Sequence, residues 1–415
     1  MFGRSAPQRT THNGSVAARG RTVGFADSAL RSAAAMALVG AVLAGTLLGS
    51  SPVAAAPLTT APPTVAACTF APTTVPAQSG FGTAETTSPF STPAPADHIG
   101  ILRAFSSASP VVKQLNLAET VGINQTASTA DARKAVDDNY GIEGPAIFDG
   151  LGSRLAPAFS AALRAGQLPK TSALLFGDDA IIGKRVGTSK EKKHFANPRP
   201  FEVAPQLIHR YSDSRPDLYE EVRGSGSYPS GHTTWGYTQA FLIAALLPEI
   251  GPQVLARGAE YGFHRVVLGV HYPLDVVGGR IFAQAVSSEL LGDSRFQGLF
   301  GEARTELRTV LAARAGGPIA RIVACQQPWS PTAAALTSYR ERATYAFPTT
   351  GATDRAPQIP AGAENLIRAA HPGLSTAALR NILARTALPS GHPLDLTGPG
   401  GGWERLDIAR AWVTR

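Results

Sequence analysis

The chain has 415 residues, of which 44% are hydrophobic and 16% charged, so it can bury a sizeable core and is not a disordered polar chain. Its 42 glycines and 32 prolines follow no G-X-Y period, which excludes collagen. The formal net charge is +8, and half of it lies in residues 1–56. The charge of the remaining chain is too small to favour nucleic acid as a partner.

The N-terminal segment has the features of a secretory signal peptide. An uncharged run rich in Ala, Val, Leu and Gly, residues 32–48, follows Arg31 and precedes small residues at 54–56. This run is slightly shorter than the roughly 20 residues of a membrane span, which favours cleavage near residue 56 over a retained anchor. We therefore predict that residues 1–56 are removed and that the mature protein is secreted or stays in the cell envelope, without stable membrane insertion.

Residues 57–96 are mostly Thr, Pro, Ala and Ser with almost no charge, which is typical of an extended linker or strap. Cys68 in this segment and Cys325 are the only two cysteines. In an exported protein they could pair and tie the strap to the C-terminal region. Both could also be buried free thiols.

Apolar residues at helical spacing follow the strap, with no alternating strand runs to compete. The segments are 101–105, 111–121, 155–163, 241–247, 255–270 and 276–291. They predict a mostly α-helical domain of about 200 residues. Residues 296–415 contain Ala/Arg-rich helical stretches, one of them with Ser375 as a candidate N-cap, and are predicted to form a helical extension of unknown role.

Residues 224–234, GSGSYPSGHTT, contain a candidate anion site. Ser230 precedes an apolar helical stretch like an N-cap residue, so the first-turn N–H groups beside Gly231 would point outward. His232 could donate a proton to a leaving oxygen, because the pKa of histidine lies near working pH. Taken alone, the segment is as consistent with a capped turn that has no chemical role.

Residues 264–275, HRVVLGVHYPLD, contain a histidine and a carboxylate in helical register. Pro273 is well placed to begin a helix, and Asp275 would then lie in its first turn, one turn from His271. A carboxylate that holds one imidazole nitrogen fixes the tautomer and directs the other nitrogen outward as a nucleophile. For an isolated pair, a structural His–Asp contact at a helix end is the commoner explanation.

Residues 192–200 supply cations. Lys192 and Arg199, which precedes Pro200, could hold a transferring phosphoryl group, whose charge is spread over three oxygens that guanidinium groups fit well. Four of the seven lysines lie within residues 184–193, so a solvated basic loop is the alternative explanation.

Together, the three segments resemble the three-part motif of the type 2 phosphatidic acid phosphatase superfamily, which includes the vanadium haloperoxidases. The residues that carry the resemblance are, in chain order, Lys192, Arg199, Pro200, Pro229, Ser230, Gly231, His232, Arg265, His271 and Asp275. The resemblance covers roughly residues 97–295. Within it, GSGSYPSGHTT is most similar to the class A bacterial non-specific acid phosphatases.

The resemblance implies that the catalytic domain, residues 97–295, is an all-α helical bundle. It also implies a two-step hydrolysis of phosphate esters without metal or other cofactor. By similarity, His271 attacks phosphorus and forms phosphohistidine, Asp275 orients it, and His232 protonates the leaving alcohol and then activates water. The residues that would hold the phosphoryl oxygens are Lys192, Arg199, Ser230, Gly231 and Arg265. Vanadate would then be an inhibitor.

The chain departs from this pattern at one position and repeats part of it elsewhere. The family usually has serine before the arginine of its third segment, whereas this chain has His264, which could change the local hydrogen bonding or add a titrating group near the phosphate. Residues 389–392 repeat Pro-Ser-Gly-His, but no Arg…His…Asp array follows, so we interpret the repeat as coincidence. A second Arg-Pro pair, at 215–216, has no lysine seven residues before it.

The first hypothesis is therefore a secreted acid phosphatase that acts on small phosphate monoesters. The alternatives are a vanadium-dependent haloperoxidase with vanadate as cofactor, a phosphatase of lipid phosphates, and a non-enzymatic phosphate-binding module. The residues before Pro229 favour the phosphatase over the haloperoxidase, and the lack of several apolar spans disfavours an integral-membrane lipid phosphatase. The sequence leaves open whether the protein forms a homo-oligomer.

Overall fold

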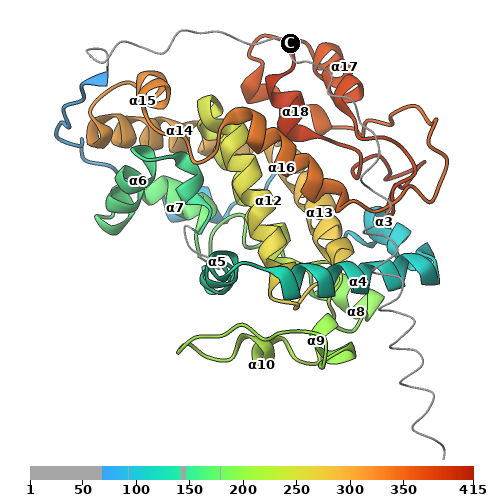
Figure 1. Ribbon diagram of the computed structural model, residues 1–415. Coiled ribbons are helices and arrows are strands. Elements are labelled where there is room, and N and C mark those ends of the chain that lie inside the picture. The colour runs from blue at the N-terminus through green and yellow to red at the C-terminus, as the bar shows by residue number, and fades with distance from the viewer. Residues whose placement is uncertain (1–67, 92, 142–145, 178) are drawn as a thin grey trace, which may run out of the picture. The chain divides into compact units, whose positions relative to one another are not determined.

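The fold was analysed in a computed structural model that describes residues 68–91, 93–141, 146–177 and 179–415 (Figure 1). These residues contain helices and no strand, which confirms the predicted all-α fold. None of the helices in these ranges is long and apolar enough to span a membrane. The predicted signal peptide and the beginning of the predicted strap lie outside the described residues.

Three consecutive helices form the centre of the core: α11 (Gly231–Leu246), α12 (Gly251–Val267) and α13 (Pro273–Gly292). They contact one another and are buried on nearly all sides, as expected for core helices. Their starts follow the predicted signals. The Ser230 hydroxyl accepts a hydrogen bond from the Thr233 N–H, and Pro273 is the first residue of α13.

Glycines allow these three helices to cross closely. A Cβ atom added to Gly258 would lie 2.6 Å from the Cβ atom of Ala240, and one added to Gly279 would lie 2.7 Å from the carbonyl oxygen of Ser230. Both distances are shorter than non-bonded atoms tolerate, so only glycine fits. The close crossing joins the beginnings of α11 and α13, where the Ser230 N–H donates to the Asp275 carbonyl oxygen over 3.0 Å.

The helices that precede the core pack around it. α4 (Pro110–Thr126) and α5 (Thr129–Asn139) contact α12, whereas α6 (Leu155–Arg164) and α7 (Pro169–Leu175) contact α14 (Ser294–Ala315). The remaining helices before α11 are short: α2 (Thr83–Thr87), α3 (Ile99–Leu102), α8 (Ser189–Phe195), α9 (Pro200–Val203) and α10 (Leu218–Val222).

The C-terminal residues pack against the same core. They form α15 (Ile319–Cys325), α16 (Thr332–Thr344), α17 (Thr376–Thr386) and α18 (Ile408–Val413), and both α16 and α18 contact α12. On α13, the buried Arg280 guanidinium donates to the carbonyl oxygen of Glu404 over 2.8 Å. The Trp412 indole N–H donates to the carbonyl oxygen of Pro248 over 3.1 Å. These two hydrogen bonds join the C-terminal segment to α13 and to the turn before α12.

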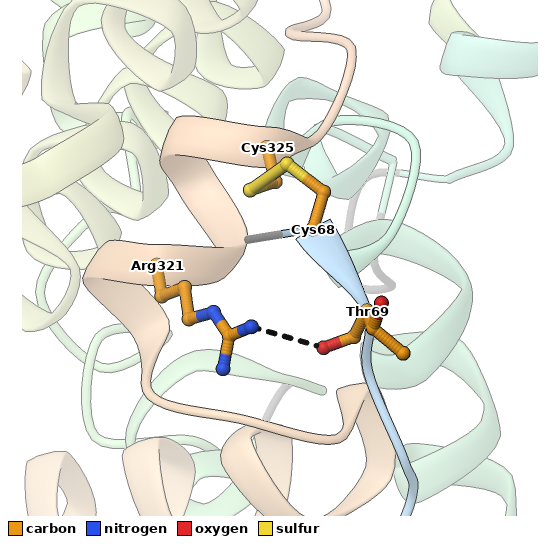
Figure 2. Close-up of a disulfide and its surroundings, with 4 residues drawn as sticks. All are labelled: Cys68, Thr69, Arg321 and Cys325. Carbon is orange, nitrogen blue, oxygen red and sulfur yellow. Dashed lines mark hydrogen bonds between the residues drawn. A yellow bond between two sulfur atoms is a disulfide. The ribbon is translucent and has the colours of Figure 1, made fainter. Parts of the chain in front are cut away.

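The two cysteines form a disulfide, which settles the alternative left open by the sequence (Figure 2). Cys68 lies at the beginning of the described chain, and Cys325 is the last residue of α15. Beside the disulfide, the Arg321 guanidinium donates to the carbonyl oxygen of Thr69 over 3.3 Å. The strap is therefore attached to the C-terminal part of the molecule by a covalent bond and a hydrogen bond.

Candidate active site

His271 and Asp275 lie together at the beginning of α13. Asp275 Oδ2 accepts from the Tyr272 N–H over 2.9 Å and lies 3.2 Å from His271 Nδ1. Because a carboxylate oxygen is an acceptor, Nδ1 carries the imidazole proton, and Nε2 is left with its lone pair. Burial raises the pKa of the Asp275 carboxyl, an effect that the Tyr272 N–H and the charge of Arg199 oppose.

The surroundings of His271 favour its neutral imidazole form. Burial lowers its pKa well below the ordinary value, and the charges of Arg199 and Lys192 lower it further. His271 Nε2 lies 3.2 Å from Arg199 Nη1. An unprotonated nitrogen held beside fixed cations is suited to attack an anionic electrophile such as a phosphoryl group.

The two arginines differ in how they are bound. Arg199 is anchored by its surroundings, since Nη1 donates to the Val270 carbonyl oxygen over 2.8 Å and Nη2 to the Ser225 hydroxyl over 3.0 Å. Arg265 is fully buried, yet its Nε and Nη2 atoms have no hydrogen-bond partner in the described residues. Burial lowers the pKa of each guanidinium to about 10, so both remain charged at neutral pH. Unpaired buried donors on a cation indicate where an oxyanion would bind.

Lys192 on α8 completes the group of cations. Burial and the charge of Arg199 lower the pKa of its ammonium group to about 7, whereas Asp275 acts in the opposite direction. Lys192, Gly231 and His232 are partly exposed to solvent, whereas the two arginines are buried. A ligand would therefore enter from the side of these three residues.

The N-terminus of α11 adds backbone donors. Ser230 caps the helix, and the N–H groups of Gly231 and His232 have no acceptor within it, because the first N–H groups of any helix lack one. The partial positive charge of this helix end favours a bound anion. Close packing also explains the glycine, since a Cβ atom on Gly231 would lie 3.0 Å from the Thr188 hydroxyl oxygen.

His232 is held by the backbone on one side. Its Nε2 atom lies 3.1 Å from the carbonyl oxygen of Asn139. A carbonyl accepts only, so Nε2 carries a proton, and Nδ1 is the nitrogen that gains or loses the second one. Burial lowers the pKa of His232 well below its ordinary value, and the charge of Arg265 contributes in the same direction. An imidazole beside the cations can serve as a general acid and base when an anion offsets their charge.

All eight predicted site residues are thus brought together at the beginnings of α11 and α13. Residues 179–291, which include all eight, match the family model described as the PAP2 superfamily. Because of this similarity, residues 179–291 are called the PAP2 segment below. The match agrees with the resemblance found from the three motifs.

Several proteins that are similar to this chain are phosphatases by name. The chain is 32% identical to a non-specific acid phosphatase of Salmonella typhimurium over 126 residues, which are 30% of this chain and 48% of that protein. It is 36% identical to an acid phosphatase of Zymomonas mobilis over 118 residues, 28% of this chain and 43% of that protein. A non-specific acid phosphatase of Providencia stuartii is 28% identical over 157 residues, 38% of this chain and 61% of that protein. The chain spans about half the length of the relatives that it matches.

Other histidines near the motifs do not join the site. His194 and His209 are exposed on the surface. His264, which stands where the family usually has serine, is buried, and its Nδ1 atom lies 2.6 Å from Asp138 Oδ2. His264 therefore takes part in a buried contact with a carboxylate.

The repeated motifs also lie elsewhere in the fold. In residues 389–392 the glycine, Gly391, has a φ angle of +89° and belongs to a turn in which its N–H donates to Asp395 Oδ2 over 2.8 Å. No helix begins there, so no set of first-turn N–H groups is presented. Arg215 of the second Arg-Pro pair forms ion pairs with Asp137 and Asp213.

Sequence reasoning missed the polar residues of α4 that form hydrogen bonds with the backbone at both ends of the connection between α12 and α13. The Asn116 side-chain oxygen accepts from the Leu274 N–H over 3.0 Å, and the Asn124 amide donates to the carbonyl oxygen of Val267 over 2.8 Å. Asn116, Thr120 and Asn124 recur every four residues, so they share one face of α4, and all three are buried. In the sequence, polar residues that recur every four positions were the signal that could have identified them.

Proposed function

We propose that the protein is a phosphatase that hydrolyses phosphate monoesters through a phosphohistidine intermediate formed on His271. The observation that supports this most directly is the pairing of an unprotonated Nε2 atom with cations whose donors are partly unused. Nε2 lies 3.2 Å from Arg199, and two buried nitrogens of Arg265 have no partner among the described residues. The similarity of the PAP2 segment to proteins named acid phosphatase points the same way.

In the first proposed step, the His271 Nε2 lone pair forms a bond to phosphorus while the bond from phosphorus to the ester oxygen breaks. His232 transfers its proton to that oxygen, and the alcohol leaves. Asp275 accepts the Nδ1–H bond and stabilises the positive charge that develops on the imidazole ring. Lys192, Arg199, Arg265 and the first N–H groups of α11 bind the three phosphoryl oxygens.

In the second proposed step, a water molecule displaces His271 from phosphorus. His232, now neutral, accepts a proton from the water molecule as its oxygen bonds to phosphorus. The bond between phosphorus and Nε2 breaks, and inorganic phosphate is released. In this scheme, side chains and backbone N–H groups of the protein supply every catalytic role, so we propose that hydrolysis requires no added metal ion.

We further propose that the protein acts outside the cytoplasm. A disulfide that joins Cys68 to Cys325 is expected in an oxidising compartment. The apolar run followed by small residues before position 56 supplies the corresponding export signal in the sequence.

The first test is hydrolysis of a chromogenic aryl phosphate by the purified mature protein from acidic to neutral pH. We expect turnover that vanadate inhibits and that EDTA does not change. His271→Ala should reduce kcat by at least about 10³-fold, because none of the other side chains that the structure describes is assigned to form the covalent intermediate. Acid-quenched wild-type enzyme should carry labelled phosphate, and the variant should carry none.

His392→Ala is the matched control, because it removes the histidine of the repeated Pro-Ser-Gly-His sequence outside the site. Its activity should equal that of the wild type. Full turnover by His271→Ala would exclude this residue as the nucleophile. Halide oxidation that appears only with vanadate, together with negligible hydrolysis, would replace the proposed function by that of a haloperoxidase.

A further inference from the structure

The end of α5 is fixed to α12 through a buried carboxylate. Asp138 Oδ1 accepts from Arg257 Nη2 over 2.7 Å, and its Oδ2 lies 2.6 Å from His264 Nδ1. Arg257 and His264 lie two turns apart on α12, so they point from the same face of that helix. All three side chains are buried, which makes this contact a rigid joint between two helices.

The next residue, Asn139, reaches the proposed site from that joint. Its Oδ1 atom accepts from Arg265 Nη1 over 2.6 Å, and its carbonyl oxygen contacts His232 Nε2 over 3.1 Å. Asn139 is itself only 5% exposed. One residue on α5 therefore contacts the phosphate-binding arginine of α12 and the acid–base histidine of α11.

Only one of the three guanidinium nitrogens of Arg265 is used by these contacts. Nη1 is taken by Asn139, whereas Nε and Nη2 remain unpaired in the described part of the chain. Because the guanidinium group is planar and rigid, fixing Nη1 also fixes the directions of the two free nitrogens. The contact between the Asn139 carbonyl oxygen and His232 Nε2 fixes the tautomer of His232, because a carbonyl oxygen only accepts hydrogen bonds.

The geometry points to Asn139 as a positioning residue for the proposed phosphatase reaction, one that aims Arg265 at the phosphoryl oxygens and sets the tautomer of His232. The inference rests on the proposed function, and the Asp138 joint with Arg257 and His264 is what makes Asn139 rigid. An amide suits this position because it accepts from Arg265 without cancelling the charge that binds the anion.

Two substitutions test the inference. Asn139→Ala removes the acceptor, so Arg265 loses its fixed orientation; we expect Kd for inorganic phosphate, measured by calorimetry, to rise at least about tenfold. Asn139→Asp keeps the size and the acceptor but adds a negative charge beside Arg265. Its phosphate Kd should also rise at least about tenfold, with the thermal unfolding midpoint close to that of the wild type.

The aspartate variant has a second readout that a structural role would not change. A carboxylate near His232 raises the pKa of the imidazole, against the lowering by Arg265, Lys192 and Arg199. The general acid must be protonated in the enzyme–substrate complex, so the alkaline limb of the pH dependence of kcat should move to higher pH. Asp137→Asn is the control, since Asp137 lies on α5, is exposed, and pairs with Arg215 outside the site.

The outcomes separate the two proposals. A wild type that neither hydrolyses phosphate esters nor binds phosphate would overturn the proposed function. If the wild type hydrolyses phosphate esters or binds phosphate, a phosphate Kd that is unchanged in both Asn139 variants would overturn the positioning role. An equal rise of the phosphate Kd in Asp137→Asn would also overturn it. If Asn139→Ala does not fold, the isosteric Asn139→Asp variant alone decides.

Discussion

At the residue scale, the cations that would bind a phosphoryl group also control the two histidines. Burial and the charges of Lys192, Arg199 and Arg265 lower the pKa values of His232 and His271 and favour their neutral forms. In the proposed mechanism, the neutral form of His271 is the reactive one. His232 must instead gain a proton to act as an acid, and a bound phosphoryl dianion favours this by offsetting the cationic charge. Binding of substrate and protonation of His232 are therefore coupled.

Lys192 provides a test of pH dependence. Its pKa of about 7 means that the ammonium charge is present below pH 7 and is lost as the pH rises through that value. Because kcat/KM follows the ionisation of the free enzyme, it should fall on the alkaline side of about pH 7. In Lys192→Arg the cation persists to higher pH, so the alkaline limb of a kcat/KM profile should move upward by at least about one pH unit.

Lys193→Arg is the control for this experiment, since Lys193 is exposed and adjacent in sequence. Its profile should coincide with that of the wild type. An alkaline limb that stays in place in Lys192→Arg would show that a different group, such as Asp275 or His232, sets it.

At the scale of helices, the site depends on the close crossing of α11 and α13. A Cβ atom on Gly279 would lie 2.7 Å from the Ser230 carbonyl oxygen and 2.8 Å from Thr233 Cβ. These atoms belong to the first turn of α11, so relief of the clash must displace the helix end that carries His232. Gly279→Ala should lower the free energy of unfolding by about 1–3 kcal/mol and reduce kcat/KM, as measured by urea unfolding and by the phosphatase assay.

Gly298→Ala is the matched substitution on the neighbouring helix, α14. Gly298 is exposed, and a Cβ atom there would meet no atom within 4 Å. The free energy of unfolding should rise by about 0.5–1 kcal/mol, because alanine favours the helical state, with activity unchanged. If Gly279→Ala were equally harmless, the helices would not be as tightly packed as described.

The difference between what the sequence predicts and what it misses has a physical basis. The starts of α11 and α13 are encoded locally, by Ser230 as N-cap and Pro273 at the first turn, and both were predicted. The residues of the three motifs were found because they are close in sequence and could be matched to a family. Asp138 and Asn139 were missed, because their partners on α12 lie 119 to 126 residues away and a polar helix end is ordinarily solvated.

At the scale of the whole molecule, the Cys68–Cys325 disulfide closes a loop with a sequence separation of 257 residues. Cross-linking so long a loop reduces the entropy of the unfolded chain, and loss of such a bond typically costs about 2–5 kcal/mol. Replacing both cysteines by serine should therefore lower the thermal unfolding midpoint. Reductant should lower the unfolding midpoint of the wild type and leave that of the double variant unchanged. If the wild type and the double variant have equal midpoints without reductant, the disulfide contributes no stability.

The position of Trp412 has a consequence for the order in which the molecule can be made. Its indole ring lies so close to Gly251, at the start of α12, that a Cβ atom there would be 2.3 Å from the indole nitrogen. A ribosome adds this residue after every residue of the site. The central helices thus lack part of their cover until Trp412 has been synthesised. A nascent chain that cannot complete its core before that point stays unfolded longer, which suits the proposed export of the chain before it folds.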